Sequence, residues 1–493
     1  MQREKALLKD HYQTDLMTKE AKANSPSQQR GFSWWVAAVF IIGETAGSGL
    51  VAMPNAIKNT GLIGGPILLI VLAVVTARTA KQLGDNWLIM QRRWPQYLET
   101  CRSPYAEMAS RSIGGRASYF AYAVIQVTLF GGASVFSLLA ARNISDLLRL
   151  FGYPVHFCIC LFAVSLFLWP FMMLRSPMHF WQVSIGAALS TTLAVILILI
   201  GTSLDIPTCF PAVSYADVSA RQFTLGFGTI VFAYGGHPVF PTIQHDMVEP
   251  RKFTKAVVLS YIVLFLLYGP ISIAGYAVYG TSISDSIVSS IQTPFLRVMI
   301  SILITLHVLF SILIIINPLH QGVEEHVGVK HEFGPGRFIV RTLVLFSTTL
   351  VASLLPNFGV FLDLVGSSSM TLLTLVFPGL FALYLETGDK LNDKTNRSTS
   401  AEDNNSIPTL RQIFDNTSKI RLLVEAIVIG GGVIFGIIST VNALQEAMRS
   451  PLASPCFVQL FTNRTGTVSS LSKFYCCGEY RNITSNDWIR CGA

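Results

Sequence analysis

Residues 43–54 form an apolar segment near the start of the chain that glycine, glutamate and proline interrupt. The segment belongs to a run long enough to cross a bilayer, which takes about 20 apolar residues, yet it carries Glu44, Gly47, Gly49 and Pro54. Glycines free the backbone to leave helical geometry. Unwound backbone at membrane depth is tolerated only where it lines a protein cavity. The pattern is typical of the broken helices that form the binding sites of secondary transporters.

The composition indicates an integral membrane protein. Hydrophobic residues make up 51% of the 493 residues and charged residues 13%, with a mean hydropathy of +0.51. Soluble domains carry about 25% charged residues. Although the net charge is +8, most basic residues lie in short loops between apolar segments, so the charge predicts orientation in a lipid bilayer and no nucleic-acid partner.

The apolar segments divide the chain into a membrane domain and two tails. A polar tail over residues 1–30 reads as disordered and cytoplasmic, residues 31–447 form the transmembrane domain, and residues 448–493 form an external tail. We predict eleven transmembrane helices, at 33–57, 61–84, 117–141, 154–174, 179–201, 222–243, 254–278, 293–316, 338–355, 358–384 and 420–447.

The distribution of lysine and arginine sets the orientation. With the N-terminus in the cytoplasm, most of the 36 Lys and Arg residues fall in cytoplasmic segments, as the positive-inside rule requires. An odd number of helices then places the C-terminus on the extracellular or lumenal side. The pattern does not distinguish the plasma membrane from a lysosomal or vesicular membrane.

The C-terminal tail combines cysteines with glycosylation sequons, which are typical of an oxidising compartment. Its sequons begin at Asn463 and Asn482. Four tail cysteines and one in the predicted external loop after the fifth helix are disulfide candidates: Cys209, Cys456, Cys476, Cys477 and Cys491. Their number is odd, so one is expected to stay free or to pair between chains. Cys158 and Cys160, within the fourth predicted helix, are expected to be small buried hydrophobes.

A second broken helix is predicted at residues 226–241. Gly235 and Gly236 precede His237 and Pro238 there, and proline cannot continue a regular helix. The two breaks are five helices apart, which suits two inverted repeats of five helices with the eleventh appended.

Two ionisable residues lie beside the predicted breaks. Glu44 is an intramembrane carboxylate, which is costly and usually functional, and His237 titrates near neutral pH when unperturbed. Both are candidate carriers of a coupling proton, although His237 could instead be a structural donor. His307 is expected to be a packed polar residue, and Asp363 to meet water near the outer end of its helix. The sequence holds no nucleotide-binding loop and no metal-ligand spacing that we recognise, so neither a cofactor nor a metal is expected.

Four sequence blocks resemble the amino acid/auxin permease family of secondary amino-acid transporters. The first helix carries GSGLVAMPNA at residues 47–56, similar to the family's G-x-G-x-L-x-x-P-x-A signature. The sixth carries FAYGGHPVFPTI at residues 232–243, followed by Asp246, Met247 and Pro250. The other blocks are Tyr105-Ala106-Glu107 with Gly114 and Gly115, and Gly366-Ser367 with FPGLF at residues 377–381. The resemblance extends over roughly residues 31–447.

The resemblance implies an all-α, eleven-helix LeuT-like fold with a 5+5 inverted repeat, and transport of small neutral amino acids by symport or exchange. It also implies that the breaks of helices one and six hold the substrate, which assigns substrate binding to Thr45, Ala46, Gly47, Ser48, Gly49, Phe232, Ala233, Tyr234, Gly235 and Gly236. Glu44 stands where family members often have an uncharged residue, and the cysteine-bearing tail is longer than the family leads us to expect.

Four functions remain open from the sequence. The leading one is a proton-coupled carrier of small neutral amino acids, and the glycine–histidine pair in the sixth helix favours the proton-coupled and vesicular branches. A sodium-coupled carrier and a vesicular exchanger are alternatives of the same class. An amino-acid sensor with little flux is an alternative of another class. An enzyme is disfavoured, because no nucleophile and base share a predicted membrane depth.

Overall fold

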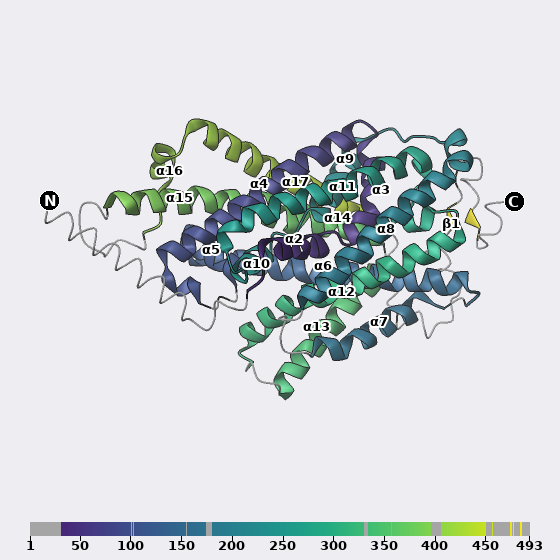
Figure 1. The fold of residues 1–493 in the computed structure, drawn as a ribbon, viewed down its shortest axis with the longest axis horizontal. Helices are drawn as coiled ribbons and strands as arrows, with labels where there is room; N and C mark the ends of the chain where they lie inside the picture. The colour runs from purple at the N-terminus through teal and green to yellow at the C-terminus, as the bar shows by residue number, and fades with distance from the viewer. Residues whose placement is uncertain are drawn as a thin grey trace.

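The computed structural model describes residues 31–99, 101, 103–153, 155–173, 180–329, 334–355, 357–395, 406–449, 456, 474–475, 477 and 484–485. Within these residues the chain is almost entirely helical, and most of its long helices run along the longest axis of the molecule (Figure 1). The predicted tail over residues 1–30 and the asparagines of both sequons, Asn463 and Asn482, lie outside the described residues.

The N-terminal half contains two helices where the sequence predicts its first span, followed by the long helices that surround them. The elements are α2 (Trp34–Thr45), α3 (Ser48–Thr60), α4 (Gly64–Arg93), α5 (Pro104–Ser112), α6 (Gly115–Leu150), α7 (Phe157–Met172) and α8 (Phe180–Cys209), with the short turns η1 (Pro95–Leu98) and η3 (Phe210–Ala212).

The C-terminal half also begins with an interrupted helix. Its elements are α9 (Ala220–Ala233), α10 (Phe240–His245), α11 (Phe253–Tyr279), α12 (Pro294–Val327), α13 (Pro335–Leu354), α14 (Phe358–Val365), α15 (Phe377–Thr395), α16 (Leu410–Asn416) and α17 (Lys419–Arg449). The turns η4 (Pro250–Lys252), η5 (Gly280–Ser282) and η6 (Ile287–Ser290) and the π-helical η7 (Gly366–Met370) and η8 (Leu372–Val376) lie between them. Strands β1 (Phe474–Tyr475) and β2 (Thr484–Ser485) pair antiparallel.

Eight helices of the described residues are long and apolar enough to cross a membrane, and nine if α2 and α3 form one bent span. By length and composition, the structure therefore matches at most nine of the eleven predicted spans. The two that fall short are α7, with 16 residues, and the interrupted pair α9 and α10, of 14 and 6 residues. A break divides the second pair into pieces too short to satisfy the length criterion.

The interrupted helices lie at the centre of the bundle. The α2 helix packs against α8 and α11, and α3 packs against α9 and α11. The residues of α2 from Ile41 to Thr45 and those of α3 from Ser48 to Pro54 are buried. Helix α9 begins with a capping box, in which the Ser219 hydroxyl accepts from the backbone N–H of Gln222, so the sequence itself fixes where this helix starts.

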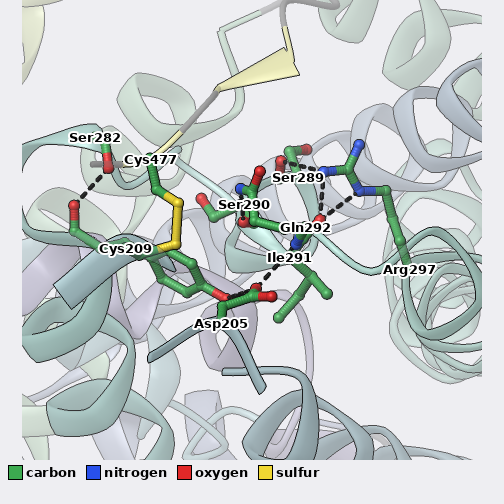
Figure 2. Close-up of a disulfide and its surroundings, with 10 residues drawn as sticks. Asp205, Cys209, Ser282, Ser289, Ser290, Ile291, Gln292, Arg297 and Cys477 are labelled. Carbon is green, nitrogen blue, oxygen red and sulfur yellow. Dashed lines mark hydrogen bonds between the residues drawn. A yellow bond between two sulfur atoms is a disulfide. The ribbon is translucent and has the colours of Figure 1, made fainter. Parts of the chain in front are cut away.

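Two disulfides join the C-terminal tail to the helical bundle. Cys209, at the last turn of α8, pairs with Cys477, and Cys158, in the first turn of α7, pairs with Cys456. The first pairing lies beside β1 and close to Asp205, which accepts hydrogen bonds from the Tyr279 hydroxyl and the Gln292 amide (Figure 2). Cys476 and Cys491 lie outside the described residues.

The position of Cys158 corrects the expectation that it is a packed hydrophobe within the fourth helix. Because α7 starts only at Phe157, Cys158 lies at the helix end, where the tail can reach it. Including Cys158 makes the number of disulfide candidates even, so the argument that one must remain unpaired no longer holds. Cys160 does remain a free, buried thiol.

Mapping peptides of the oxidised protein without reduction should recover Cys209–Cys477 and Cys158–Cys456. Each bond closes a loop of more than 260 residues, so Cys477→Ser should lower the free energy of unfolding by about 2–4 kcal/mol. Cys101 is a suitable control thiol, since burial raises its pKa to about 11 and a protonated thiol exchanges poorly. Free thiols at both pairs in protein from a eukaryotic host would contradict the assignment.

Candidate functional site

The first helix break lies between α2 and α3, whose axes differ by 59°. Helix α2 ends at Thr45 and α3 begins at Ser48, which leaves Ala46 and Gly47 between them. The first N–H groups of a helix lack intrahelical acceptors and lie at the positive end of its dipole. Ser48 and Gly49 supply these groups, so the start of α3 is suited to an anion such as a carboxylate.

The second break lies between α9 and α10, where residues 234–239 are not helical. A Cβ at Gly236 would lie 2.6 Å from the Thr45 hydroxyl, and one at Gly235 would meet the side chain of Met370 in η7. The two breaks are therefore in direct contact, and Gly236 is required by this contact and not only by the local turn.

Hydroxyl groups satisfy the backbone carbonyls that the breaks release. The Tyr268 hydroxyl lies 3.0 Å from the Thr45 carbonyl and 2.8 Å from the Ala233 carbonyl, and so joins the last turns of α2 and α9. The Tyr261 hydroxyl donates to the Tyr234 carbonyl at 3.1 Å, and the Thr191 hydroxyl donates to the Ala46 carbonyl at 3.3 Å. Sequence reasoning missed these residues, because Tyr261 and Tyr268 lie in α11 and Thr191 in α8, within uniformly apolar helices.

The glycines of the first break have different surroundings. A Cβ at Gly49 would lie 2.6 Å from the Cα of Ala233, so Gly49 permits α3 and α9 to touch. A Cβ at Gly47 would instead lie 2.9 Å from the ring tip of Phe136 and 3.5 Å from Nε2 of His307. The Phe136 ring meets that of Phe232 edge to face. Gly47 is therefore the glycine that faces side chains, and Gly49 serves helix packing.

The two predicted coupling residues differ in how they are held. Glu44 is buried, and its side chain accepts a hydrogen bond from the Thr45 hydroxyl at 3.4 Å. His237 is fully buried, and its Nε2 lies 3.2 Å from the Thr76 carbonyl and 3.1 Å from the Thr79 hydroxyl of α4. Because a carbonyl only accepts, Nε2 of His237 carries a proton in this arrangement. The imidazole thus links the second break to α4.

The structure corrects the expectation for Asp363 and agrees with the expectation that His307 is a packed polar residue. Asp363 does not meet water, because it is 7% exposed and accepts a hydrogen bond from the Thr229 hydroxyl of α9. His307 is 1% exposed and is hydrogen-bonded to α8 beside the first break. No signal in the sequence identifies the hydrogen-bond partners of these two residues, because the partners are more than 100 residues away.

Several buried polar groups around the breaks have no hydrogen-bond partner within the described residues. Buried polar atoms are normally satisfied, so such groups indicate where a ligand or water binds. The hydroxyls among them are those of Ser48, Tyr234, Ser369 and Thr374, and Nδ1 of His237 is a further such atom. Ser48 and Tyr234 belong to the predicted substrate-binding set, whereas Ser369 and Thr374 lie in or beside the π-helical turns η7 and η8, a distortion that is frequent at functional sites. Among the described residues no group of three His, Cys, Asp or Glu side chains could hold a metal ion.

Two interrupted helices in contact at the centre of a helical membrane domain define a LeuT-like secondary transporter fold. Mhp1, a nucleobase-cation-symport-1 family transporter, matches this fold with a TM-score of 0.50 and 11% sequence identity, over 88% of this chain and 98% of Mhp1.

The family model for transmembrane amino acid transporter proteins matches residues 30–401, and the chain belongs to this family. Similar proteins from Arabidopsis thaliana include the amino acid transporter AVT1D, 25% identical over 70% of this chain and 62% of AVT1D. Another is the lysine histidine transporter-like 1 protein, 25% identical over 68% of this chain and 76% of that protein. The chain thus spans less than two thirds of AVT1D. The family to which the chain belongs is one of transmembrane amino acid transporters.

Proposed function

We propose that this protein is a secondary active transporter that moves small neutral amino acids together with a proton. The observation that carries the proposal is the contact between the two helix breaks, with the N-terminus of α3 and the unpartnered Ser48 and Tyr234 hydroxyls beside it. A helix N-terminus suits the substrate carboxylate, and hydroxyls suit its ammonium group.

The preference for small neutral side chains is supported by the aromatic pair at the first break. Phe136 comes close to Gly47 and contacts Phe232, so the space near the backbone is bounded by apolar rings. A charged side chain that packed against these two rings would bear a desolvation cost.

Coupling to a proton instead of sodium is supported by the hydroxyl caps. In sodium-coupled carriers of this type, unwound carbonyls and half-helix C-terminal ends coordinate the ion. Here the Ala46 and Tyr234 carbonyls accept from hydroxyl groups, and the Tyr268 hydroxyl, which has one hydrogen, lies between the Thr45 and Ala233 carbonyls and serves one or the other. Glu44 is the proposed proton carrier, because it is a buried carboxylate beside this break, and ionised carboxylates inside a membrane are costly. His237 is the rival carrier, although its contact with the Thr76 carbonyl suits a structural role.

Competition against radiolabelled L-alanine uptake into proteoliposomes tests the substrate class. Glycine, L-alanine and L-serine should compete, whereas L-lysine, L-glutamate and L-tryptophan should not. A sensor is distinguished by the same assay, because it would bind L-alanine without measurable flux. Competition only by charged or large amino acids would reject the proposed selectivity.

The proposed topology has eleven membrane crossings, a cytoplasmic N-terminus and an extracellular or lumenal C-terminus. Glycosidase treatment should then lower the apparent mass of protein from a eukaryotic host, and the double variant Asn463→Gln, Asn482→Gln should abolish the shift. The single variant Asn404→Gln, in the proposed cytoplasmic loop, is the control. A glycan that disappears with Asn404 would invert the orientation.

A further inference from the structure

The strongest feature not yet assigned a role is a hydrogen-bonded chain that ends at the first helix break. Nδ1 of His307 lies 3.0 Å from the Ala187 carbonyl and 2.6 Å from the Thr191 hydroxyl oxygen, and Nε2 lies 3.1 Å from the Ser311 hydroxyl. The Thr191 hydroxyl in turn donates to the Ala46 carbonyl. The chain therefore runs from Ser311 on α12, through His307 and α8, to the unwound backbone.

The hydrogen-bond partners fix the tautomer of the neutral ring. Because the Ala187 carbonyl only accepts, Nδ1 carries the proton, and the Thr191 oxygen also lies close enough to accept from it. The Thr191 O–H is then free to donate to Ala46. Nε2 accepts from the Ser311 hydroxyl in this state. An added proton would therefore bind at Nε2, and the Ser311 oxygen would turn to accept it.

Nε2 is also the ring atom that faces the break. It lies 3.5 Å from the position that a Cβ of Gly47 would occupy. Gly47 has no side chain that could lie between Nε2 and the N-terminus of α3 at Ser48. A positive charge at Nε2 would lie beside the backbone N–H groups that suit a carboxylate, and would add to their attraction.

We propose that His307 is a proton-binding group that pairs with the carboxylate of the substrate at the first helix break. The inference rests on the proposed function and names a second protonation site beside Glu44. Proton binding at His307 strengthens substrate binding, and by linkage the substrate strengthens proton binding by the same factor.

Other ionisable groups on the elements packed against α12 do not take part in this chain. Within the described residues none is hydrogen-bonded or ion-paired to His307. They are Glu44 on α2, Arg116, Tyr119, Tyr122, Arg142, Asp146 and Arg149 on α6, His156 and Cys160 at α7, Asp205 on α8, Arg297, His320, Glu324, Glu325 and His326 on α12, and Arg337 and Arg341 on α13. The local partners of His307 are all uncharged, so its charge depends on the proton and on the ligand.

Binding of radiolabelled L-alanine to the purified full-length protein, with simultaneous measurement of proton uptake, tests the inference without requiring transport. Wild-type affinity should weaken as pH rises through the range in which the imidazole loses its proton. His307→Gln should bind about 5- to 150-fold more weakly at acidic pH, with a flattened pH profile and fewer protons taken up per L-alanine. Glu44→Gln should keep the His307-dependent part of the proton uptake.

His320→Gln is the matched control, because His320 is also fully buried on α12 and has no role in the proposal. Its affinity and proton uptake should equal those of wild type. Thr191→Val is a milder variant that keeps His307 and removes its hydrogen-bonded link to Ala46. If His307→Gln misfolds, a reduced affinity of Thr191→Val with an intact pH profile would still support the assigned chain. An unchanged affinity of Thr191→Val would contradict it. If folded His307→Gln retains the wild-type affinity, pH profile and proton uptake, the inference is wrong. A wild type that binds no L-alanine at any pH would instead reject the proposed function.

Discussion

Gly47→Val should yield a protein that reaches the membrane but no longer takes up amino acids. The added side chain would enter the space between Phe136 and Nε2 of His307 and displace a ligand from the start of α3. Losing a hydrogen bond to a charged carboxylate costs about 1.5–3 kcal/mol, which weakens affinity by roughly tenfold to a hundredfold. Radiolabelled uptake, normalised to surface protein, measures the loss.

Two further glycines give this experiment its controls. Gly430 is on α17, and a Cβ there meets no atom within 4 Å, so Gly430→Val should transport normally. Gly49→Val should fail at an earlier stage, because its side chain would strike the backbone of Ala233 and reduce the amount of folded protein. If Gly47→Val transports at the wild-type rate, the start of α3 does not contact the substrate.

Glu44→Gln should leave amino-acid exchange intact and abolish accumulation driven by pH. Glutamine preserves the shape of the side chain but cannot carry a proton. One pH unit corresponds to about 1.4 kcal/mol per proton, so a wild-type carrier moving one proton can accumulate substrate roughly tenfold when the outside is more acidic by one unit. If Glu44 carries the coupled proton, the ratio of internal to external substrate in Glu44→Gln should fall to one.

His237→Ala tests the rival carrier under the same conditions. Because His237 bonds to the Thr76 carbonyl, we expect this variant to lose protein stability while the surviving fraction stays coupled to pH. If Glu44→Gln accumulates substrate as strongly as wild type and His237→Ala does not, the assignment of the two residues must be exchanged.

Local sequence was sufficient to predict both helix breaks. Glycine pairs and proline act on the backbone of their own segment, so the interruptions at Gly47 and at Gly235–Pro238 are visible without any knowledge of neighbours. The outer helices were predictable for a similar reason, because apolar runs of about 20 residues indicate membrane spans.

Contacts between distant segments account for what the sequence did not reveal. The bond between Thr191 and His307 joins residues 116 positions apart, and Tyr268 lies 223 positions from Thr45. Nothing in the apolar pattern of their helices marks Thr191, His307 or Tyr268 as a contact of the break. The different roles of Gly47 and Gly49 also depend on which distant helix packs against each glycine. The role of Cys158 was predicted wrongly because the start of α7 could not be located to within one turn from the sequence.

The measurement that tests the central claim most directly is L-alanine uptake into proteoliposomes with proton and sodium gradients imposed separately. A proton-coupled amino-acid carrier should accumulate L-alanine above the external concentration when only the outside is acidified, and should ignore an inward sodium gradient at equal pH. Accumulation that follows sodium and ignores pH would contradict the account, and would mean that the carbonyls now bonded to Tyr268 and Thr191 open to bind the ion.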